Sequence, residues 1–170
     1  MKEATEANET IDIHVDGHHC DDALVDAAVS SQMFVGARAV WDMKTLHTIF
    51  LTRAEPASIG LSSIGSRLAP ISIDDECGLY MRLDGEPDAS ATTVTAPIAP
   101  GTVEDVNITQ WRKIAPGEKI EVNIHPGTIA LDGEREVELL PTQEVYVTLS
   151  MDGPWVVDVP SAMRLVSRKT

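Results

Sequence analysis

The sequence predicts an all-β domain, mainly antiparallel, folded as a sandwich or barrel of about ten short strands. The clearest indication is Asp132-Gly133, which lies between two runs, residues 128–131 and 134–139, whose apolar residues fall on alternate positions. A two-residue hairpin turn needs positive φ at both central positions, which Asp tolerates and Gly adopts at almost no steric cost. The same pair recurs with β-like runs around it at Asp16-Gly17, Asp84-Gly85 and Asp152-Gly153.

Most of the chain consists of such short runs separated by turn residues. The runs that predict strands are residues 11–15, 78–83, 106–114, 119–124, 128–131, 134–139, 144–151 and 154–159. The turns or polar connections predicted between them are residues 18–22, 86–95, 96–101 and 116–117. In residues 144–151 the alternation is regular, so Val145, Val147 and Leu149 are expected to share one buried face.

Four segments do not fit the strand pattern. Residues 1–10 are polar and acidic and are expected to be a disordered leader or a cloning remnant, which leaves residues 11–170 as one β-rich domain. Residues 42–51 have the spacing of a short helix, and residues 160–168 predict a second one. Residues 58–73 are rich in Ser and Gly and carry one charge, which is typical of a segment close to a ligand or to another backbone.

Composition limits the classes of partner. The chain has 170 residues and a formal net charge of −14, from 27 acidic and 13 basic residues. Such a surface repels phosphate backbones and anionic lipids, so no nucleic-acid or membrane partner is expected. No apolar run reaches the roughly 20 residues that cross a bilayer, no secretory signal is present, and Cys20 and Cys77 do not make a disulfide framework. We therefore expect a cytoplasmic protein.

No residue pattern points directly to catalysis or to a metal. Residues 18–22 read His-His-Cys-Asp-Asp, but neighbouring residues in an extended segment point in opposite directions, so a polar turn is favoured over a metal site. His125 is interpreted as a packed or solvated turn residue, and no Ser-His-Asp triad is legible from spacing. The chain also lacks the clustered glycines that bind phosphates. A nucleotide's phosphates would therefore be held elsewhere.

Residues 34–42, 59–65, 96–101 and 127–136, with the ending at 152–168, form a combination that is far more specific than any one segment. This combination resembles the C-terminal half of the ATP-NAD kinase-like family, and within it the acetoin catabolism protein X group. The resemblance implies a NAD kinase C-terminal-type β-sandwich with one or two short helices, packed beside an N-terminal α/β domain. The family's Gly-Gly-Asp-Gly-Thr motif, which binds the ATP phosphates in that other domain, is missing from this sequence.

The resemblance also implies substrate-binding residues. Asp26 ends a segment similar to the Ala-Leu-Asn-Glu segment that contacts the dinucleotide in NAD kinases, although Val25 stands where the Asn would be. Ser62, Ser63 and Gly65 fall in a segment similar to the family's substrate loop, whose usual tyrosine has no counterpart here.

A third segment of this kind is the turn Asp132-Gly133-Glu134. It resembles a turn shared with diacylglycerol-type lipid kinases, where the Glu approaches the site of phosphoryl transfer. The residues alone predict only a turn, and contact of Glu134 with a nucleotide or metal is a separate hypothesis. No catalytic residue and no metal ligand is predicted.

Two functions remain open. The chain is either the substrate-side domain of an ATP-dependent NAD kinase-like phosphotransferase, inactive without an N-terminal α/β kinase domain or subunit, or a non-catalytic nucleotide-binding or protein-assembly module. ATP and NAD are the ligands implied by the full-length family, and Val25 in place of Asn slightly favours the second function. A β domain separated from its partner exposes an apolar face, so a homo-oligomer is also expected.

Overall fold

The computed structural model describes all residues except 1–4, 34–42, 158, 160–162 and 165–170. Its main element is a six-stranded antiparallel sheet. In spatial order its strands are β12 (Arg135–Leu139), β11 (Gly127–Leu131), β4 (Asp26–Ser30), β5 (Leu46–Leu51), β6 (Gly78–Arg82) and β9 (Gln110–Ile114). The expected all-β, mainly antiparallel fold is confirmed.

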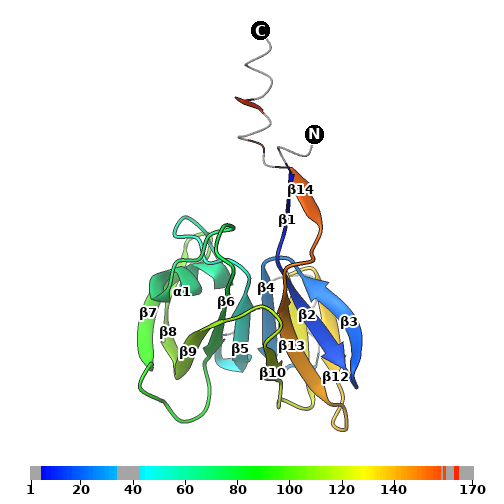
Figure 1. Cartoon of the computed structure of the whole chain (residues 1–170). Helices are drawn as coiled ribbons and strands as arrows, with labels where there is room; N and C mark the ends of the chain where they lie inside the picture. Colours follow the sequence, from blue (N-terminus) through cyan, green and yellow to red (C-terminus); the bar gives the residue numbers. More distant parts are fainter. Residues whose placement is uncertain (1–4, 34–42, 158, 160–162, 165–170) are drawn as a thin grey trace.

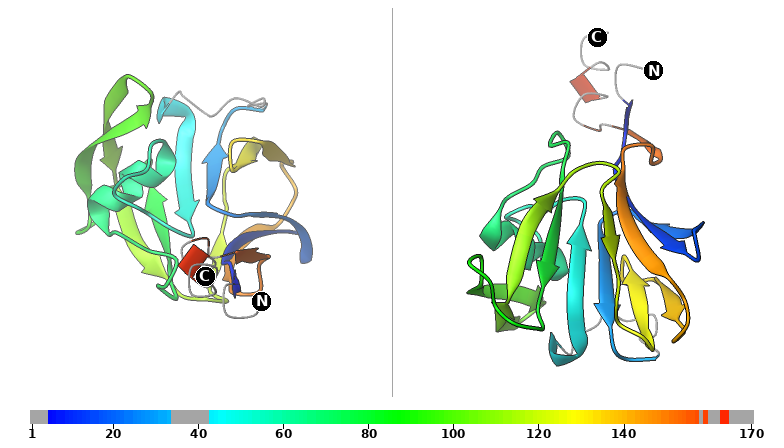
Figure 2. Two further views of the ribbon diagram at one scale, coloured as in Figure 1. Left: turned by 90° about the horizontal axis from the view of Figure 1, so that it is seen from above. Right: turned by 60° about the horizontal axis from the view of Figure 1, so that its bottom comes forward.

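Two further layers cover this sheet (Figures 1 and 2). On one side lies a four-stranded antiparallel sheet, and on the other lie one helix and a β-hairpin. The four strands in order are β10 (Lys119–Glu121), β13 (Val145–Ser150), β2 (Thr10–Val15) and β3 (His18–Ala23). The opposite layer contains α1 (Leu61–Leu68), β7 (Thr92–Ala99) and β8 (Thr102–Ile108). A 3-10 turn, η2 (Met43–Thr45), leads into β5.

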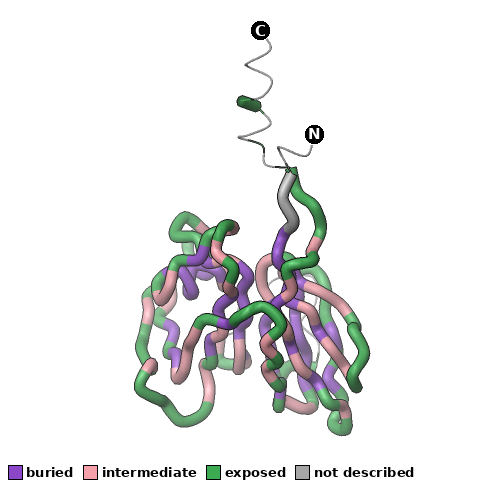
Figure 3. The backbone as a smooth tube through the Cα atoms, in the orientation of Figure 1, coloured by how far each residue is buried: buried purple, intermediate pink, exposed green. Residues whose placement is uncertain are grey.

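The core is divided into two clusters by the six-stranded sheet. Ala27, Val29 and Ile129 point towards the four-stranded sheet, whereas Ala28 and Ala130 point towards α1 and the hairpin. Figure 3 shows the resulting burial along the central strands. Because both faces are covered, all five residues of β11 are buried, including Thr128 and Ala130 as well as Ile129 and Leu131.

The predicted hairpin around Asp132-Gly133 is present. Asp132 and Gly133 have φ of 52° and 68°, and β11 pairs with β12 from Leu131↔Arg135 onwards. Residues 144–151 also behave as expected, since Val145, Val147 and Leu149 alternate as buried residues along β13.

The predicted helix at 42–51 is wrong. Residues 46–51 form β5 in the middle of the six-stranded sheet, where Ile49 and Phe50 are buried on opposite faces. Their spacing fits a helix only because a strand buried on both sides has no polar face to reveal its period. The helix of this half is α1, inside the Ser- and Gly-rich segment 58–73.

Other expectations change in detail. Residues 18–22 are part of strand β3 rather than a turn, and residues 96–99 belong to β7. The strand expected over 106–114 is two strands, β8 and β9, interrupted at Thr109, whose side chain donates a hydrogen bond to the carbonyl of Asp84 (2.6 Å). Asp84-Gly85 therefore ends β6 without forming a hairpin, since the neighbours of β6 are β5 and β9.

Two segments near the termini pair in a separate ribbon. Strand β1 (Thr5–Ala7) pairs with β14 (Trp155–Val157). The sequence suggested that Asp152-Gly153 forms a hairpin turn between β13 and β14. In the structure β14 pairs with β1 instead. The expected disordered leader is wrong from residue 5 onwards, because residues 5–7 are a strand and Asn8, Glu9 and Thr10 are buried. The predicted helix at 160–168 falls mostly outside the described residues.

Candidate functional site

The residues that the sequence singled out in two distant segments meet at one end of the six-stranded sheet. There β4 begins at Asp26 and β11 ends beside it. The Asp132 N–H donates to the carbonyl oxygen of Asp26 (2.9 Å). In return the Asp132 carboxylate accepts bonds from the backbone N–H groups of Leu24, Val25 and Asp26, at 2.8, 2.7 and 3.2 Å. The turn is thus fixed onto the segment that carries Asp26.

This arrangement brings the carboxyl groups of Asp26 and Asp132 close enough to repel each other. Burial, with the neighbouring Asp132 carboxylate as a second cause, raises the pKa of Asp26 to about 6. Strand alternation places Asp26 on the same face as Ala28, which packs in one cluster with Ile64 of α1. Asp26 is therefore a partly buried acid that titrates near neutral pH and lies on the face that α1 covers.

A second unusual acid, Glu9, lies at the same end of the fold. It is 5% exposed, its Oε1 atom has no hydrogen-bond partner, and burial raises its pKa to about 7 even though Arg53 opposes the shift. Arg53 in turn donates to the side chain of Asn8 (3.2 Å). The residue before it, Thr52, donates through its backbone N–H to the carbonyl of Val25 (3.0 Å), which links this group to the Asp26 segment.

The predicted site residues of the Ser- and Gly-rich segment make hydrogen bonds and packing contacts within the domain. The Ser62 hydroxyl donates to the carbonyl of Arg53 (3.0 Å), and the Ser63 hydroxyl contacts the carbonyls of Gly60 (2.7 Å) and Pro97 (3.0 Å). A side chain at Gly65 would collide with Leu51 and Leu79. These bonds fix the start of α1 against its neighbours, and substrate binding by the three residues stays a prediction.

The last predicted residue, Glu134, is exposed at the tip of the turn. Its backbone N–H closes the turn by donating to the carbonyl of Leu131 (3.0 Å). Next to it, Arg135 forms an ion pair with Asp21 and donates to the carbonyl of Asp22 (2.6 Å), so the turn is also tied to β3. The structure therefore brings Asp26 together with Asp132, and it leaves Glu134 facing solvent.

Comparison with known proteins identifies the fold's family. Residues 9–152 match the family model described as the acetoin catabolism protein X C-terminal domain. The chain is also 38% identical, over 170 residues, to acetoin catabolism protein X of Cupriavidus necator. The chain belongs to the acetoin catabolism protein X family. The match covers 98% of the chain but 47% of that relative, so the chain spans about half the relative's length.

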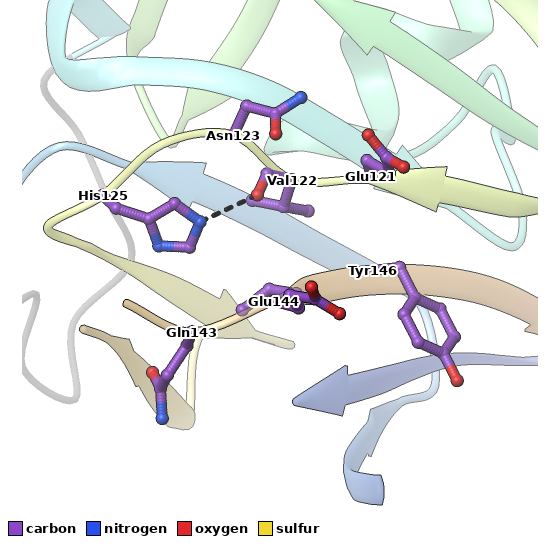
Figure 4. Close-up of a pocket in the computed structure, with 8 residues that line it drawn as sticks. Glu121, Val122, Asn123, His125, Gln143, Glu144 and Tyr146 are labelled. Atoms are coloured by element: carbon purple, nitrogen blue, oxygen red, sulfur yellow. Dashed lines mark hydrogen bonds between the residues drawn. The ribbon is translucent and has the colours of Figure 1, made fainter. Parts of the chain in front are cut away.

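Elsewhere in this acetoin catabolism protein X domain, a cavity of about 370 Å³ lies beside the end of β10 and the start of β13 (Figure 4). Glu121 and Asn123 line it from one side, and Glu144 and Tyr146 from the other. His125 donates through Nε2 to the carbonyl of Val122 (3.0 Å), which matches its interpretation as a packed turn residue. None of the predicted site residues lines this cavity.

A second cavity, of about 350 Å³, lies at the opposite end of the six-stranded sheet from Asp26. It contains a polar cluster that the sequence did not indicate. The Asp84 carboxylate accepts from His47 Nδ1 (2.6 Å) and from Arg82 Nε (2.9 Å). Burial would raise the pKa of Asp84, but these bonds outweigh it and lower the pKa. The cluster is internally paired except for His47 Nε2, which is buried without a partner.

The described part of the chain contains no group of three or more His, Cys, Asp or Glu side chains that could hold a metal ion. Among the same residues, no helix is long and apolar enough to cross a membrane.

Proposed function

We propose that this chain is the substrate-side domain of an ATP-dependent, NAD kinase-like phosphotransferase of the acetoin catabolism protein X family, inactive alone. The observation that carries the proposal is the Asp26 and Asp132 pair, because it joins two segments that resemble ligand-binding segments of the kinase family. Acids with strongly shifted pKa values concentrate at functional sites. Asp26 and Glu9, with pKa values of about 6 and 7, both lie at this end of the fold.

The role proposed for these acids is recognition of the phosphoryl acceptor. A carboxylate accepts hydrogen bonds from the hydroxyl groups of a ribose-like substrate, and its partial burial makes each such bond stronger than in water. Phosphoryl transfer itself depends on positioning and on neutralising charge around the phosphates. This chain has a net charge of −14 and no glycine-rich phosphate loop, so that part of the reaction belongs to another domain or subunit.

A specific observation also favours the second candidate, a non-catalytic nucleotide-binding or assembly module. The Asn of the related dinucleotide segment is replaced by Val25, whose backbone N–H is already bound to Asp132. The Ser62 and Ser63 hydroxyls are likewise used inside the domain. Both candidates place a ligand at the same end of the fold, and only the first requires turnover when the phosphate-binding part is supplied.

The test is a titration of the chain with NAD, and separately with ATP, followed by amide chemical shifts. We expect NAD to shift residues 24–26 and 132–134, and Asp26→Asn to weaken binding about tenfold, the effect of one lost charged hydrogen bond. Glu138→Gln is the matched control, since Glu138 is exposed on β12. NAD shifts located elsewhere, or phosphorylation of NAD by this chain alone, would contradict the proposal.

A further inference from the structure

The ribbon formed by β1 and β14 differs from the rest of the fold. It projects away from the body of the domain (Figure 1). Its strands form a two-stranded sheet of their own, and neither pairs with another described strand. An isolated pair of strands is only marginally stable in water. The ribbon is therefore the part of the described structure that most needs additional packing.

Several exposed apolar side chains lie close together in and directly after the ribbon. Trp155 is 72% exposed and Val157 is 58% exposed, and Val159 and Met163 beyond the strand are exposed to 61% and 63%. The sequence has only three tryptophans. Contiguous exposed apolar residues mark interaction surfaces, and tryptophan is among the residue types enriched at their centres.

Backbone hydrogen bonds fix the base of the ribbon to the body of the domain. The Asn8 N–H donates to the carbonyl of Pro154 and the Gly153 N–H donates to the carbonyl of Asn8, both at 3.0 Å. A side chain at Gly153 would collide with that Asn8 carbonyl and with Thr10. Only glycine permits this close approach, so the direction of the ribbon is set by a tight backbone contact.

The family comparison indicates what covers the ribbon. The C-terminal domain model matches residues 9–152, so both strands of the ribbon lie just outside the conserved domain. Similarity to the Cupriavidus necator protein nevertheless extends over 98% of the chain, and hence into the ribbon. The described residues nearest to both termini lie in the ribbon or shortly after it (Figure 1). A polypeptide half joined at either terminus would therefore begin close to the ribbon.

We propose that the β1–β14 ribbon is the docking surface for the other half of an acetoin catabolism protein X. The partner extends the ribbon's sheet by a strand or packs an apolar face onto Trp155 and Val157. A second copy of this chain is the less favoured occupant, because two surfaces of net charge −14 repel each other. The proposal rests on the family assignment and is independent of the proposed phosphotransferase activity.

The experiment joins the half of the Cupriavidus necator protein outside the matched region to the N-terminus of this chain and measures amide hydrogen exchange. We expect residues 5–7 and 155–157 to exchange at least tenfold more slowly in the fusion than in the isolated chain. Trp155→Ser with Val157→Ser should abolish that protection. Val103→Ser, a control at a residue that is 63% exposed on β8, should leave it unchanged.

Three results would overturn the proposal. Ribbon exchange that is equal in the fusion and the isolated chain would show that the other half does not cover it. Equal loss of protection in the Val103 control would show that the effect is not specific to the ribbon. Light scattering that finds a dimer of the isolated chain, lost in the Trp155 and Val157 variant, would assign the ribbon to a second copy. Activity is not measured, so failure here leaves the phosphotransferase proposal to its own test.

Discussion

Two aspartates at opposite ends of the six-stranded sheet have opposite electrostatic environments. Asp84, just after β6, accepts bonds from His47 and Arg82, and its pKa is lowered. Asp26, at the start of β4, is set beside the Asp132 carboxylate, and its pKa is raised to about 6. At the Asp84 end, a histidine and an arginine therefore favour the charged carboxylate. At the Asp26 end, burial and the neighbouring carboxylate oppose ionisation of Asp26, whereas Asp132 itself accepts three backbone N–H bonds and lies 4.0 Å from Arg135.

The largest effect is expected from breaking the turn that holds Asp26. Asp132→Ala removes the acceptor for three backbone N–H groups and places Ala at a φ of 52°, a conformation that Ala disfavours. We expect a loss of about 3 kcal/mol in the free energy of unfolding, measured by urea denaturation. Glu138→Gln should lose less than about 0.5 kcal/mol. A comparable loss in both variants would show that the turn is not specifically stabilising.

Removing the hydrogen bonds of Asp84 should reduce the free energy of unfolding somewhat less. Asp84→Ala leaves His47 Nδ1 and Arg82 Nε without their acceptor, and about 2 kcal/mol of stability should be lost, because the cluster is partly screened by solvent. The control is Asp105→Ala, which removes one exposed bond from the Thr95 hydroxyl and should change stability by about 0.5 kcal/mol. An unchanged unfolding midpoint for Asp84→Ala would remove the contrast between the two ends.

The pH dependence of the Asp26 end should have the opposite sign from that of an ordinary ion pair. Since the pKa of Asp26 is about 6 when folded and near 3.8 when unfolded, the folded chain binds the proton more tightly. Its contribution to stability is therefore lost as the pH rises from about 4 to about 6. Asp26→Asn has no such titration, so it should be more stable than the parent by about 1–2 kcal/mol at pH 8 and equal at pH 3.5.

That difference is measured by urea denaturation of both proteins across the pH range. Glu9, whose pKa is about 7, also lowers stability as the pH rises, but it is present in both proteins and cancels in the comparison. Parallel curves for Asp26→Asn and the parent would contradict the raised pKa. If the variant is more stable but binds NAD more weakly, the acid is retained for binding at the expense of stability.

The sequence predicted the fold class and the central hairpin because both depend on local chemistry. Asp132-Gly133 needs positive φ, and the alternation in β13 reveals its buried face. The placement of β5 was not predictable, because a strand covered on both sides by other layers loses its period of two. What covers a strand is a property of the whole fold and is not encoded in its own residues.

The candidate site was predictable in part for the same reason. Asp26 and Asp132 could be selected by resemblance, but their contact depends on β4 pairing with β11, about a hundred residues away. Glu9 was missed because a polar N-terminus suggested a leader, and the groups that surround it, Arg53 and Asp75, are distant in the sequence. The cluster of His47 with Asp84 gave no signal, since His47 lies on β5, Asp84 follows β6, and no motif links the two.

The smallest effect on stability is expected at Glu134, which sharpens the contrast with Asp132 two residues before it. Glu134 is exposed, and its contribution to the turn is a backbone N–H bond that any residue except proline retains. Glu134→Gln should therefore change the free energy of unfolding by less than about 0.5 kcal/mol in the same urea assay. A loss above about 1 kcal/mol would mean that this acid, like Asp132, holds the turn. If stability is unchanged, any change in NAD affinity in the variant can be attributed to contact with the ligand, because the turn that presents Glu134 is intact.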